Sequence, residues 1–314
     1  MKNNVSMNSK PRSEKKTNTN YRKEKNFQNL GHMIKMIQYY HMNNKISVVI
    51  YTRNEEKNIK ECIESAKLLT KNILVVDMES NDKTIEIAKK EGVNIVSFPY
   101  SFYVEPAREF GIQKTKTDWA FVLDADERII KELATEIQNV IASEAKQSHQ
   151  KQIASSSSTP RDDKSTHYKA SRKNIFGQKQ WLKHGGWWPD YQIRLINKKY
   201  FKAWPKEIHS TPIIDGQCGY LTNPLLHYFH GDIEQMVKKT IIFENIESDL
   251  LYKAKKNVST ATFFRKFLGE LFRRFIKGKG FLDDTIGIIE SIYQAFSKTI
   301  TYIFLYEKQK SRPL

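Results

Sequence analysis

Five apolar residues run directly into two carboxylates in the stretch Trp119-Ala-Phe-Val-Leu-Asp-Ala-Asp-Glu127. A short apolar segment followed by polar residues predicts a buried strand over Trp119–Leu123. Ligands of open α/β sheets bind where strands end, which places Asp124 and Asp126 at a candidate site. Two carboxylates there can hold Mg²⁺ or Mn²⁺, since these ions prefer oxygen ligands and often share substrate phosphates. The alternative is that the pair only caps the turn before a helix expected at Lys131–Ile141.

Segments with strand character alternate with segments of helical periodicity before this stretch. Strands are expected at residues 45–51, 73–77 and 93–97, and helices near 59–66, 85–90 and 108–114. Asn54 is the expected N-terminal cap of the first helix. This alternation predicts βαβ units and an α/β fold with a mostly parallel sheet flanked by helices. Neither a dinucleotide-binding GxGxxG nor a P-loop motif occurs in the sequence.

The composition allows a folded domain with a strongly basic surface. The 314 residues are 39% hydrophobic, and 52 basic against 35 acidic side chains give a net charge of +17. Such a charge attracts nucleic acid, anionic lipid or phosphorylated substrates without choosing among them. Cys62 and Cys218 form neither a disulfide framework nor a metal-binding spacing, which favours a reducing compartment. We recognise no signal peptide or spanning segment and expect a cytoplasmic protein that rests on a membrane.

The chain divides into three parts by composition. Residues 1–44 are rich in Asn, Lys and Ser and are expected to be a disordered basic extension. Residues 45–235 form the predicted α/β domain, and the polar, serine-rich segment 143–166 is expected to be a surface insertion within it. Residues 236–314 are expected to form a helical region that associates with a membrane.

One helix of this C-terminal region has a broad apolar face. Eight apolar side chains between Phe263 and Ile276 share that face, and Lys266, Arg273 and Lys277 lie opposite. A basic amphipathic helix of this kind is typical of proteins that lie in the headgroup region of an anionic bilayer. The alternative is that the same face packs on the domain.

An aromatic, glycine-rich run occupies Gln180-Trp-Leu-Lys-His-Gly-Gly-Trp-Trp-Pro-Asp-Tyr-Gln-Ile-Arg-Leu195. Its two adjacent glycines permit unusual backbone angles, and its tryptophans offer flat apolar surfaces suited to a sugar ring. Ordinary core aromatics are the alternative. Further polar signals follow at Glu207-Ile-His209 and His227-Tyr-Phe-His230.

Four segments together resemble the family 2 glycosyltransferases of the GT-A fold. They are Ser47-Val-Val-Ile-Tyr-Thr-Arg-Asn-Glu-Glu56, Val75-Val-Asp-Met-Glu-Ser-Asn-Asp-Lys-Thr84, the Asp-x-Asp motif Asp124-Ala-Asp126, and Gly185-Gly-Trp-Trp-Pro-Asp-Tyr-Gln-Ile-Arg194. The last segment and Gly280-Phe-Leu-Asp-Asp284 more narrowly resemble lipopolysaccharide core biosynthesis glucosyltransferases of the WaaE/KdtX type. The resemblance runs from about Lys45 to about Lys298, without the insertion.

The resemblance implies a metal-dependent, inverting hexosyltransferase. Its donor would be a nucleotide sugar such as UDP-glucose, and its acceptor a lipid-linked saccharide such as the lipopolysaccharide inner core. Mg²⁺ or Mn²⁺ would be the cofactor. The implied partner surface is an anionic membrane, on the inner face of the cytoplasmic membrane, and no nucleic acid is expected.

The resemblance also implies roles for residues that bind the donor. Thr52, Glu55 and Asp77 would frame the nucleotide base and ribose. Arg108 would meet the diphosphate, and Asp124 would contact the ribose or a metal-bound phosphate.

The metal and the proton-accepting base complete the implied site. Asp126 would be the principal metal ligand, with Asp124 beside it. His209 would either complete the metal shell or be a buried, hydrogen-bonded histidine. Asp190 is our candidate for the base that accepts the proton of the acceptor hydroxyl, and Glu207 is the alternative.

Departures from the family pattern keep other hypotheses open. Glu109 stands where the family has Asn, Met78-Glu79 where a turn usually reads Asp-Ser, Lys83 where a glycine is usual, and Ser210 where Glu is common. These changes and the insertion would also fit a catalytically impaired paralogue. A basic nucleic-acid-binding protein is another alternative, although no recognised module is present. A phosphatase would instead place its aspartate pair after the first strand.

Overall fold

The computed structural model describes residues 45–153, 165–177, 179–229 and 233–310. These residues belong to one compact unit, Lys45–Leu314. The extension 1–44, much of the predicted insertion and His230 lie outside the described residues.

Four parallel strands in the order β3-β2-β1-β4 form the first half of the main sheet. The elements of this half are β1 (Ile46–Thr52), α2 (Ile59–Ala66), β2 (Ile73–Asp77), α3 (Thr84–Lys90), β3 (Asn94–Ser97), α4 (Glu105–Lys114) and β4 (Trp119–Asp124). Helices alternate with these strands, so the predicted βαβ units are confirmed. Trp119–Leu123 is buried throughout, as expected of a central strand.

The second half of the sheet makes it a mixed one. The order continues β8-β6-β12-β5, and β8 runs antiparallel to both β4 and β6. Its elements are β5 (Glu127–Arg128), α5 (Lys131–Ile153), β6 (Ser165–Phe176), β7 (Gln180–Trp181), β8 (Asp190–Asn197), β9 (Phe201–Ala203), β10 (Ile213–Ile214), β11 (Gln217–Tyr220) and β12 (Leu225–His227). β7 and β11 pair with β6, and β9 with β10 forms a separate two-stranded sheet. The predicted α/β class, with a sheet flanked by helices, is confirmed.

Side chains that alternate along the strands form the buried core on both faces of the sheet. Val49 and Tyr51 of β1 pack with Ala107 and Ile112 of α4 in one buried cluster. The intervening residues of the strand point to the other face because successive side chains alternate. Helix α4 approaches β1 closely at Gly111, where an added Cβ would lie 2.5 Å from the Tyr51 hydroxyl.

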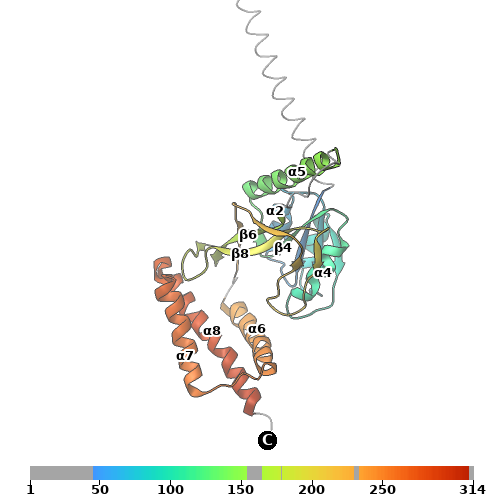
Figure 1. The fold of residues 1–314 in the computed structure, drawn as a ribbon. Coiled ribbons are helices and arrows are strands. Elements are labelled where there is room, and N and C mark those ends of the chain that lie inside the picture. Colours follow the sequence, from blue (N-terminus) through green and yellow to red (C-terminus); the bar gives the residue numbers. More distant parts are fainter. Residues whose placement is uncertain (1–44, 154–164, 178, 230–232, 311–314) are drawn as a thin grey trace, which may run out of the picture. The chain divides into compact units, whose positions relative to one another are not determined.

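The C-terminal elements are helical: α6 (Ile233–Lys253), α7 (Thr260–Leu271), the π-helical turn η1 (Phe272–Lys277), the 3₁₀ turn η2 (Gly280–Asp283) and α8 (Asp284–Lys310). Helix α8 packs against both α6 and α7 (Figure 1). Hydrogen bonds join α6 to α8, since Glu244 accepts from the hydroxyls of Ser297 and Thr301. The Thr240 and Tyr293 hydroxyls lie 2.7 Å apart.

Two details of the predicted helices are wrong. Helix α5 was expected to end at Ile141 but continues to Ile153, into the segment 143–166. The sequence Glu144-Ala-Lys-Gln147 explains this, since these four residues have high helix propensity. The cap of α2 is Asn58 rather than Asn54. Asn54 has a positive φ of 52°, and its side chain instead accepts a hydrogen bond from the backbone N–H of Asn81.

Candidate active site

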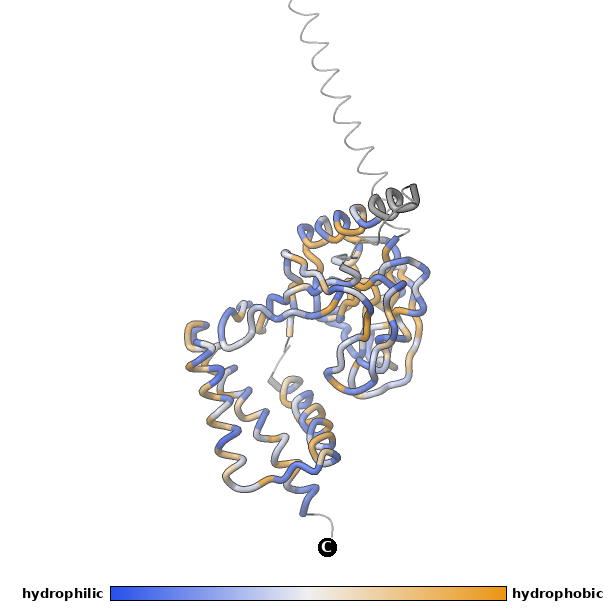
Figure 2. Tube along the Cα trace, in the orientation of Figure 1, coloured by the Kyte–Doolittle hydropathy of each residue, from blue (hydrophilic) through white to orange (hydrophobic). Residues whose placement is uncertain are grey.

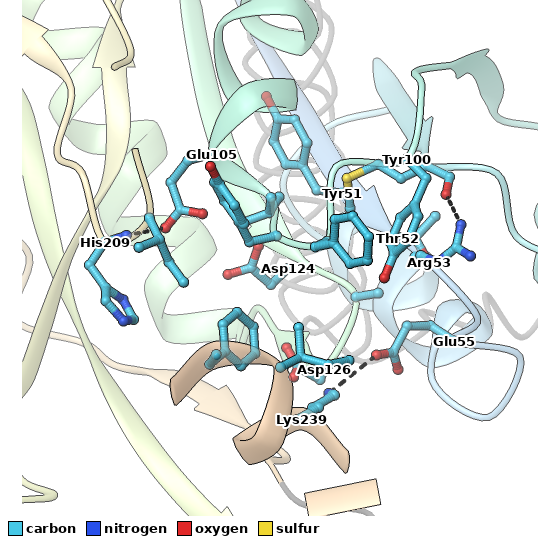
Figure 3. Close-up of a pocket in the computed structure, with 18 of the residues that line it drawn as sticks. Tyr51, Thr52, Arg53, Glu55, Tyr100, Glu105, Asp124, Asp126, His209 and Lys239 are labelled. Atoms are coloured by element: carbon cyan, nitrogen blue, oxygen red, sulfur yellow. Dashed lines mark hydrogen bonds and ion pairs between the residues drawn. The ribbon is translucent and has the colours of Figure 1, made fainter. Parts of the chain in front are cut away.

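The carboxyl ends of β1 and β4 meet at one edge of the sheet, where register pairs Tyr51 with Asp124. A pocket of about 400 Å³ opens there (Figure 3). Its lining comes from seven segments of the chain: Tyr51, Thr52, Arg53 and Glu55; Met78; Tyr100, Phe102, Tyr103, Val104 and Glu105; Asp124, Ala125 and Asp126; Ile208 and His209; His227; and Lys239, Ile242 and Phe243 of α6. Both aspartates of the Asp-x-Asp motif therefore face one cavity.

Asp124 is held by two buried arginines. Arg108 Nη2 lies 2.7 Å from Asp124 Oδ1, and Arg194 Nη2 lies 2.8 Å from Asp124 Oδ2. Burial alone would raise the pKa of Asp124, but the two guanidinium charges lower it below its ordinary value. Both carboxylate oxygens are thus engaged by protein cations.

A second buried acid extends these charge pairs below the pocket. Glu127 is fully buried, and its Oε1 lies 2.6 Å from Arg194 Nη2. Arg172 Nη1 approaches the same oxygen at 3.6 Å. Buried charges are tolerated when they are paired in this way, so each member depends on its partners.

Asp190 belongs to the same network. Its Oδ2 lies 2.6 Å from Arg172 Nη2, Asn174 Nδ2 donates to it at 3.2 Å, and Gln192 Nε2 donates to Oδ1 at 3.0 Å. Burial would raise the pKa of Asp190, but Arg172 and these hydrogen bonds lower it. A carboxylate held in this way is charged at neutral pH and has a low proton affinity.

His227 joins this network to Asp126. The Asn174 amide donates to Asp190 and to the Trp187 carbonyl, so its Oδ1 is the acceptor for His227 Nδ1, which lies 2.6 Å away. The Nδ1 atom therefore carries a hydrogen by assignment from the network. The other ring nitrogen, Nε2, lies 3.5 Å from Asp126 Oδ2.

Asp126 and His227 are suited to a divalent cation. Burial would raise the pKa of Asp126, but the neighbouring His227 and Lys239 hold that pKa well below the ordinary range. An imidazole whose Nδ1–H is bound by an amide oxygen presents Nε2 in the form that ligates metals. Among the described residues no group of three or more His, Cys, Asp or Glu is arranged to hold a metal. One carboxylate and one imidazole fit a cation that takes its remaining ligands from substrate phosphates and water.

Glu55 and Lys239 face Asp126 across the pocket. Glu55 Oε2 accepts a hydrogen bond from Asn58 Nδ2, and Oε1 lies 3.9 Å from Lys239 Nζ. Burial and the nearby charge of Asp126 both raise the pKa of Glu55. A carboxylate whose proton affinity is raised by a neighbouring carboxylate marks a place where a cation would be stabilised.

The remaining predicted site residues fall into two groups. Thr52 and His209 line the pocket, and His209 lies beside Glu105 on the side away from Glu55 and Lys239 (Figure 3). The His209 backbone N–H donates to Glu105 at 2.8 Å. Of the pocket's two histidines, His227 is the one whose ring approaches Asp126.

Four predicted residues, Asp77, Arg108, Asp190 and Glu207, are not among the described residues that line the pocket. Asp77 is buried and accepts hydrogen bonds from the N–H and hydroxyl of Ser80, so it shapes the turn after β2. Glu207 is exposed. Arg108 and Asp190 belong to the charge network below the pocket.

Sequence reasoning missed the residues that connect this network. Arg172 and Asn174 lie on β6, where the sequence carries no motif, and only the strand pairing reveals them. The pairing sets Arg172 opposite Asp190 and Asn174 beside His227. The sequence did carry signals for two other members of the network, since Glu127 directly follows the aspartate pair and Arg194 ends the segment Gly185–Arg194 quoted above.

Comparisons with known proteins found relatives in sequence and in structure. An uncharacterized glycosyltransferase of Rickettsia conorii is 28% identical over 273 residues, covering 84% of this chain and 90% of the relative. The structure of Staphylococcus aureus TarS 1–349 in complex with UDP-GlcNAc matches at a TM-score of 0.42 and 13% identity, covering 85% of this chain and 92% of that one. Glucosyl-3-phosphoglycerate synthase from Mycobacterium tuberculosis, in complex with Mg²⁺ and UDP, matches at 0.38 and 14% identity, covering 69% and 81%.

The family model described as glycosyl transferase family 2 matches residues 47–204, which include all but the first residue of β1, the Asp-x-Asp motif and β8. The mixed sheet, its flanking helices and the C-terminal helix are those of the GT-A fold. The chain belongs to glycosyl transferase family 2.

Proposed function

We propose that the protein is an inverting glycosyltransferase that moves a sugar, glucose, from UDP-glucose to a lipid-linked saccharide. The observation that carries the proposal is the Asp126–His227 pair at the wall of a pocket of about 400 Å³. The proposed acceptor is the lipopolysaccharide inner core, as in the WaaE/KdtX type of enzyme.

The donor would lie in the pocket between β1 and α6. Thr52 and Glu55 would bind the nucleoside, and Asp77 would support them by shaping the turn after β2. Arg108 and Arg194 would act indirectly, since they fix Asp124 beside the ribose and phosphates. Each role is a proposal that follows from the side chain's position at the pocket or its contact with the network.

The metal site would consist of Asp126 and His227, with His209 a further ligand if its segment moves toward them. A bound Mg²⁺ or Mn²⁺ would supply Lewis-acid neutralisation of the negative charge on the diphosphate. The protein's own part is to keep Asp126 ionised and His227 oriented. Asn174 performs the second task through its contact with His227 Nδ1.

The acceptor hydroxyl must lose its proton as it attacks the anomeric carbon. We propose Asp190 as the base, with Glu207 as the alternative. Asp190 is ionised but tied to Arg172 at 2.6 Å, so it could accept a proton only after that ion pair loosens. Glu207 is exposed and would have to approach the pocket with its loop.

A lipid-linked acceptor requires the enzyme to work at a membrane surface. Helix α7 and η1 have the required face, because their apolar side chains divide into two stripes. Phe263, Phe267, Leu271 and Phe275 are half-buried, and Phe263 contacts Tyr306 of α8. Phe264, Leu268 and Phe272 are 67%, 58% and 59% exposed, and Ile276 continues this second stripe. Hydrophobic segments recur along α7 and α8 (Figure 2).

This second stripe, Phe264-Leu268-Phe272-Ile276, is our proposed membrane-docking surface. Exposed Arg265, Lys277 and Lys279 lie on the same two elements or just after them, where they could meet anionic headgroups. Within the described residues, no helix combines the length and apolarity needed to cross a membrane. We therefore propose peripheral attachment to the inner face of the cytoplasmic membrane.

Two assays test this function. The first incubates the full-length protein with labelled nucleotide sugars, Mn²⁺ and a lipid extract containing lipopolysaccharide precursors, and expects transfer from UDP-glucose to the lipid fraction. No transfer from any nucleotide sugar would contradict the proposal.

The second assay measures sedimentation with vesicles of phosphatidylglycerol and phosphatidylethanolamine. Replacing Phe264, Leu268 and Phe272 by Ser should abolish binding without altering the thermal midpoint. Replacing the half-buried Phe267 and Leu271 should lower the midpoint, because those side chains pack inward. Vesicle binding that survives the exposed-stripe substitutions would contradict the docking surface.

A further inference from the structure

Helix α6 forms one wall of the candidate active site. Lys239, Ile242 and Phe243 line the same pocket as Asp126 (Figure 3). The family match ends at residue 204, so this wall comes from a part of the chain beyond it. The Asp-x-Asp site does not by itself imply a role for any residue of α6.

The other side of α6 is fixed to α8. Glu244 accepts hydrogen bonds from Ser297 and Thr301, and Thr240 pairs with Tyr293. Lys308 near the end of α8 donates to Ser248 Oγ at 2.6 Å. These hydrogen bonds fix α6 against α8. Lys239 therefore reaches the pocket from a helix that is held in place, rather than from a loop.

Lys239 differs from the other basic side chain of the lining, Arg53. The Arg53 guanidinium donates to the carbonyls of Met78 and Glu79 and lies 3.5 Å from the centre of the Tyr100 ring. These contacts already engage the guanidinium with the protein. Lys239 is half exposed, and its contact with Glu55 is 3.9 Å, at the outer limit of an ion pair. Its ammonium can therefore turn to a new partner at little cost.

The charge of the pocket indicates which ligand the Lys239 ammonium would bind. Asp124 is neutralised by Arg108 and Arg194. Glu105 accepts a hydrogen bond from the His209 backbone on the side of the pocket away from Lys239 (Figure 3). The acids near Lys239 are therefore Glu55 and Asp126. A diphosphate entering between these two carboxylates is repelled unless cations offset them. Lys239 Nζ lies 3.9 Å from Glu55 Oε1 and lines the same pocket as Asp126, so it lies close to the space between the two acids (Figure 3).

We propose that Lys239 binds the diphosphate of the donor and stabilises it as the leaving group. In the reaction, the bond between the anomeric carbon and the diphosphate oxygen breaks, and that oxygen keeps the electron pair. The acceptor oxygen bonds to the anomeric carbon and gives its proton to the base. The ammonium of Lys239 leaves Glu55 and donates to the diphosphate oxygens, whose charge grows in this step. The inference rests on the proposed function, and it gives the C-terminal helices a part in the donor site.

The test compares nucleoside diphosphates with their monophosphates. The full-length protein is titrated calorimetrically, in Mn²⁺, with UDP, GDP, dTDP and CDP and with the monophosphate of each one that binds. Lys239→Ala should weaken diphosphate binding by ~10-fold or more, the size of one charge-assisted hydrogen bond, and monophosphate binding by less than ~2-fold. Lys239→Arg should restore most of the diphosphate affinity.

Lys238→Ala is the matched control. Lys238 is the neighbouring lysine of α6, and its ion pair with Glu234 is exposed, so its loss should leave both affinities at the wild-type value. Equal thermal midpoints of the variants would show that α6 remains folded.

The outcomes separate the inference from the function on which it rests. If the wild-type protein binds a diphosphate and Lys239→Ala binds it equally well, the inference is wrong and the function stands. The same holds if diphosphate and monophosphate affinities fall together. If the wild-type protein binds none of the four diphosphates, both are overturned.

Discussion

The ring of His227 bridges Asn174 and Asp126, with Nδ1 2.6 Å from Asn174 Oδ1 and Nε2 3.5 Å from Asp126 Oδ2. The Asn174 amide also donates to Asp190, which Arg172 binds at 2.6 Å. The second aspartate of the Asp-x-Asp motif is therefore tied, through one histidine, to the same polar network that holds the first. The network fixes the ring orientation before any ligand arrives.

The first prediction concerns which histidine serves the metal. His227→Ala should weaken Mn²⁺ binding in the presence of a nucleoside diphosphate by ~10-fold or more, the range found when a metal shell loses a supporting group. His209→Ala is the matched variant, because both histidines line the pocket. The Mn²⁺ affinity of both variants can be measured by a titration in which electron paramagnetic resonance detects the free Mn²⁺. A large loss in His209→Ala with none in His227→Ala would reverse our assignment.

The second prediction concerns the buried charges. Arg194→Met leaves Glu127 with only the longer contact to Arg172 and leaves one oxygen of Asp124 unpaired, which should cost about 3–5 kcal/mol of unfolding free energy. Urea denaturation at pH 7 measures it. Lys90→Met, which breaks the exposed Glu86–Lys90 pair, serves as the control and should leave the urea midpoint unchanged. If the two variants have the same midpoint, the network contributes no special stability.

The third prediction separates the two candidate bases. Asp190→Asn should retain nucleoside diphosphate affinity and lose turnover by ~100-fold or more, the usual contribution of a general base. Glu207→Gln should leave turnover near the wild-type rate. The opposite pattern, measured as initial rates at saturating donor, would transfer the role to Glu207.

The fourth prediction uses a buried acid of α8. Glu290 is fully buried with no hydrogen-bond partner for Oε1, and burial raises its pKa from 4.5 to about 7. Because the pKa of Glu290 is raised in the folded state, its contribution to the free energy of unfolding is complete below pH 4.5. That contribution is lost as the pH rises through 7, where the buried carboxyl group becomes charged. Glu290→Gln should therefore gain about 3 kcal/mol of unfolding free energy at pH 8 and little at pH 5.

The control for this pH dependence is Glu64→Gln, an exposed position on α2. It should show the same difference from wild type at both pH values. A Glu290→Gln variant that is equally stable relative to wild type at pH 5 and pH 8 would contradict the raised pKa.

The local sequence pattern was sufficient to predict the strands and helices of the first half of the sheet. Apolar runs such as Trp119–Leu123 and the helical spacing of Ile59, Cys62, Ile63 and Ala66 predict their own burial, and all are buried. The position of Asp124 and Asp126 at the strand edge follows from the same pattern. These features depend on neighbours in the chain, which the sequence displays directly.

The network below the pocket depends instead on strand register, which the sequence does not display. Arg172 meets Asp190 because β6 pairs antiparallel with β8, and His227 lies beside Asn174 because β12 pairs parallel with β6. A shift of one residue in either register would turn these side chains to the opposite face. No local signal on β6 marks Arg172 or Asn174 in advance.

The amphipathic helix shows a different limit. Its apolar face was predicted either to dock on a membrane or to pack on the domain, and the structure divides it. Phe263 contacts Tyr306 of α8 and its i+4 neighbours are half-buried, while Phe264 and its i+4 neighbours are exposed. A face wide enough for both contacts cannot be assigned from helical periodicity alone.

The most direct test of the central claim is a calorimetric titration of UDP into the full-length protein and its Asp126→Asn variant, each with and without Mn²⁺. We predict that the wild-type protein binds UDP tightly only with Mn²⁺, and that Asp126→Asn loses this metal-dependent gain while keeping its fold. Equal UDP affinity in the two proteins with Mn²⁺, or no binding of UDP or any other nucleoside diphosphate by the wild-type protein, would contradict it.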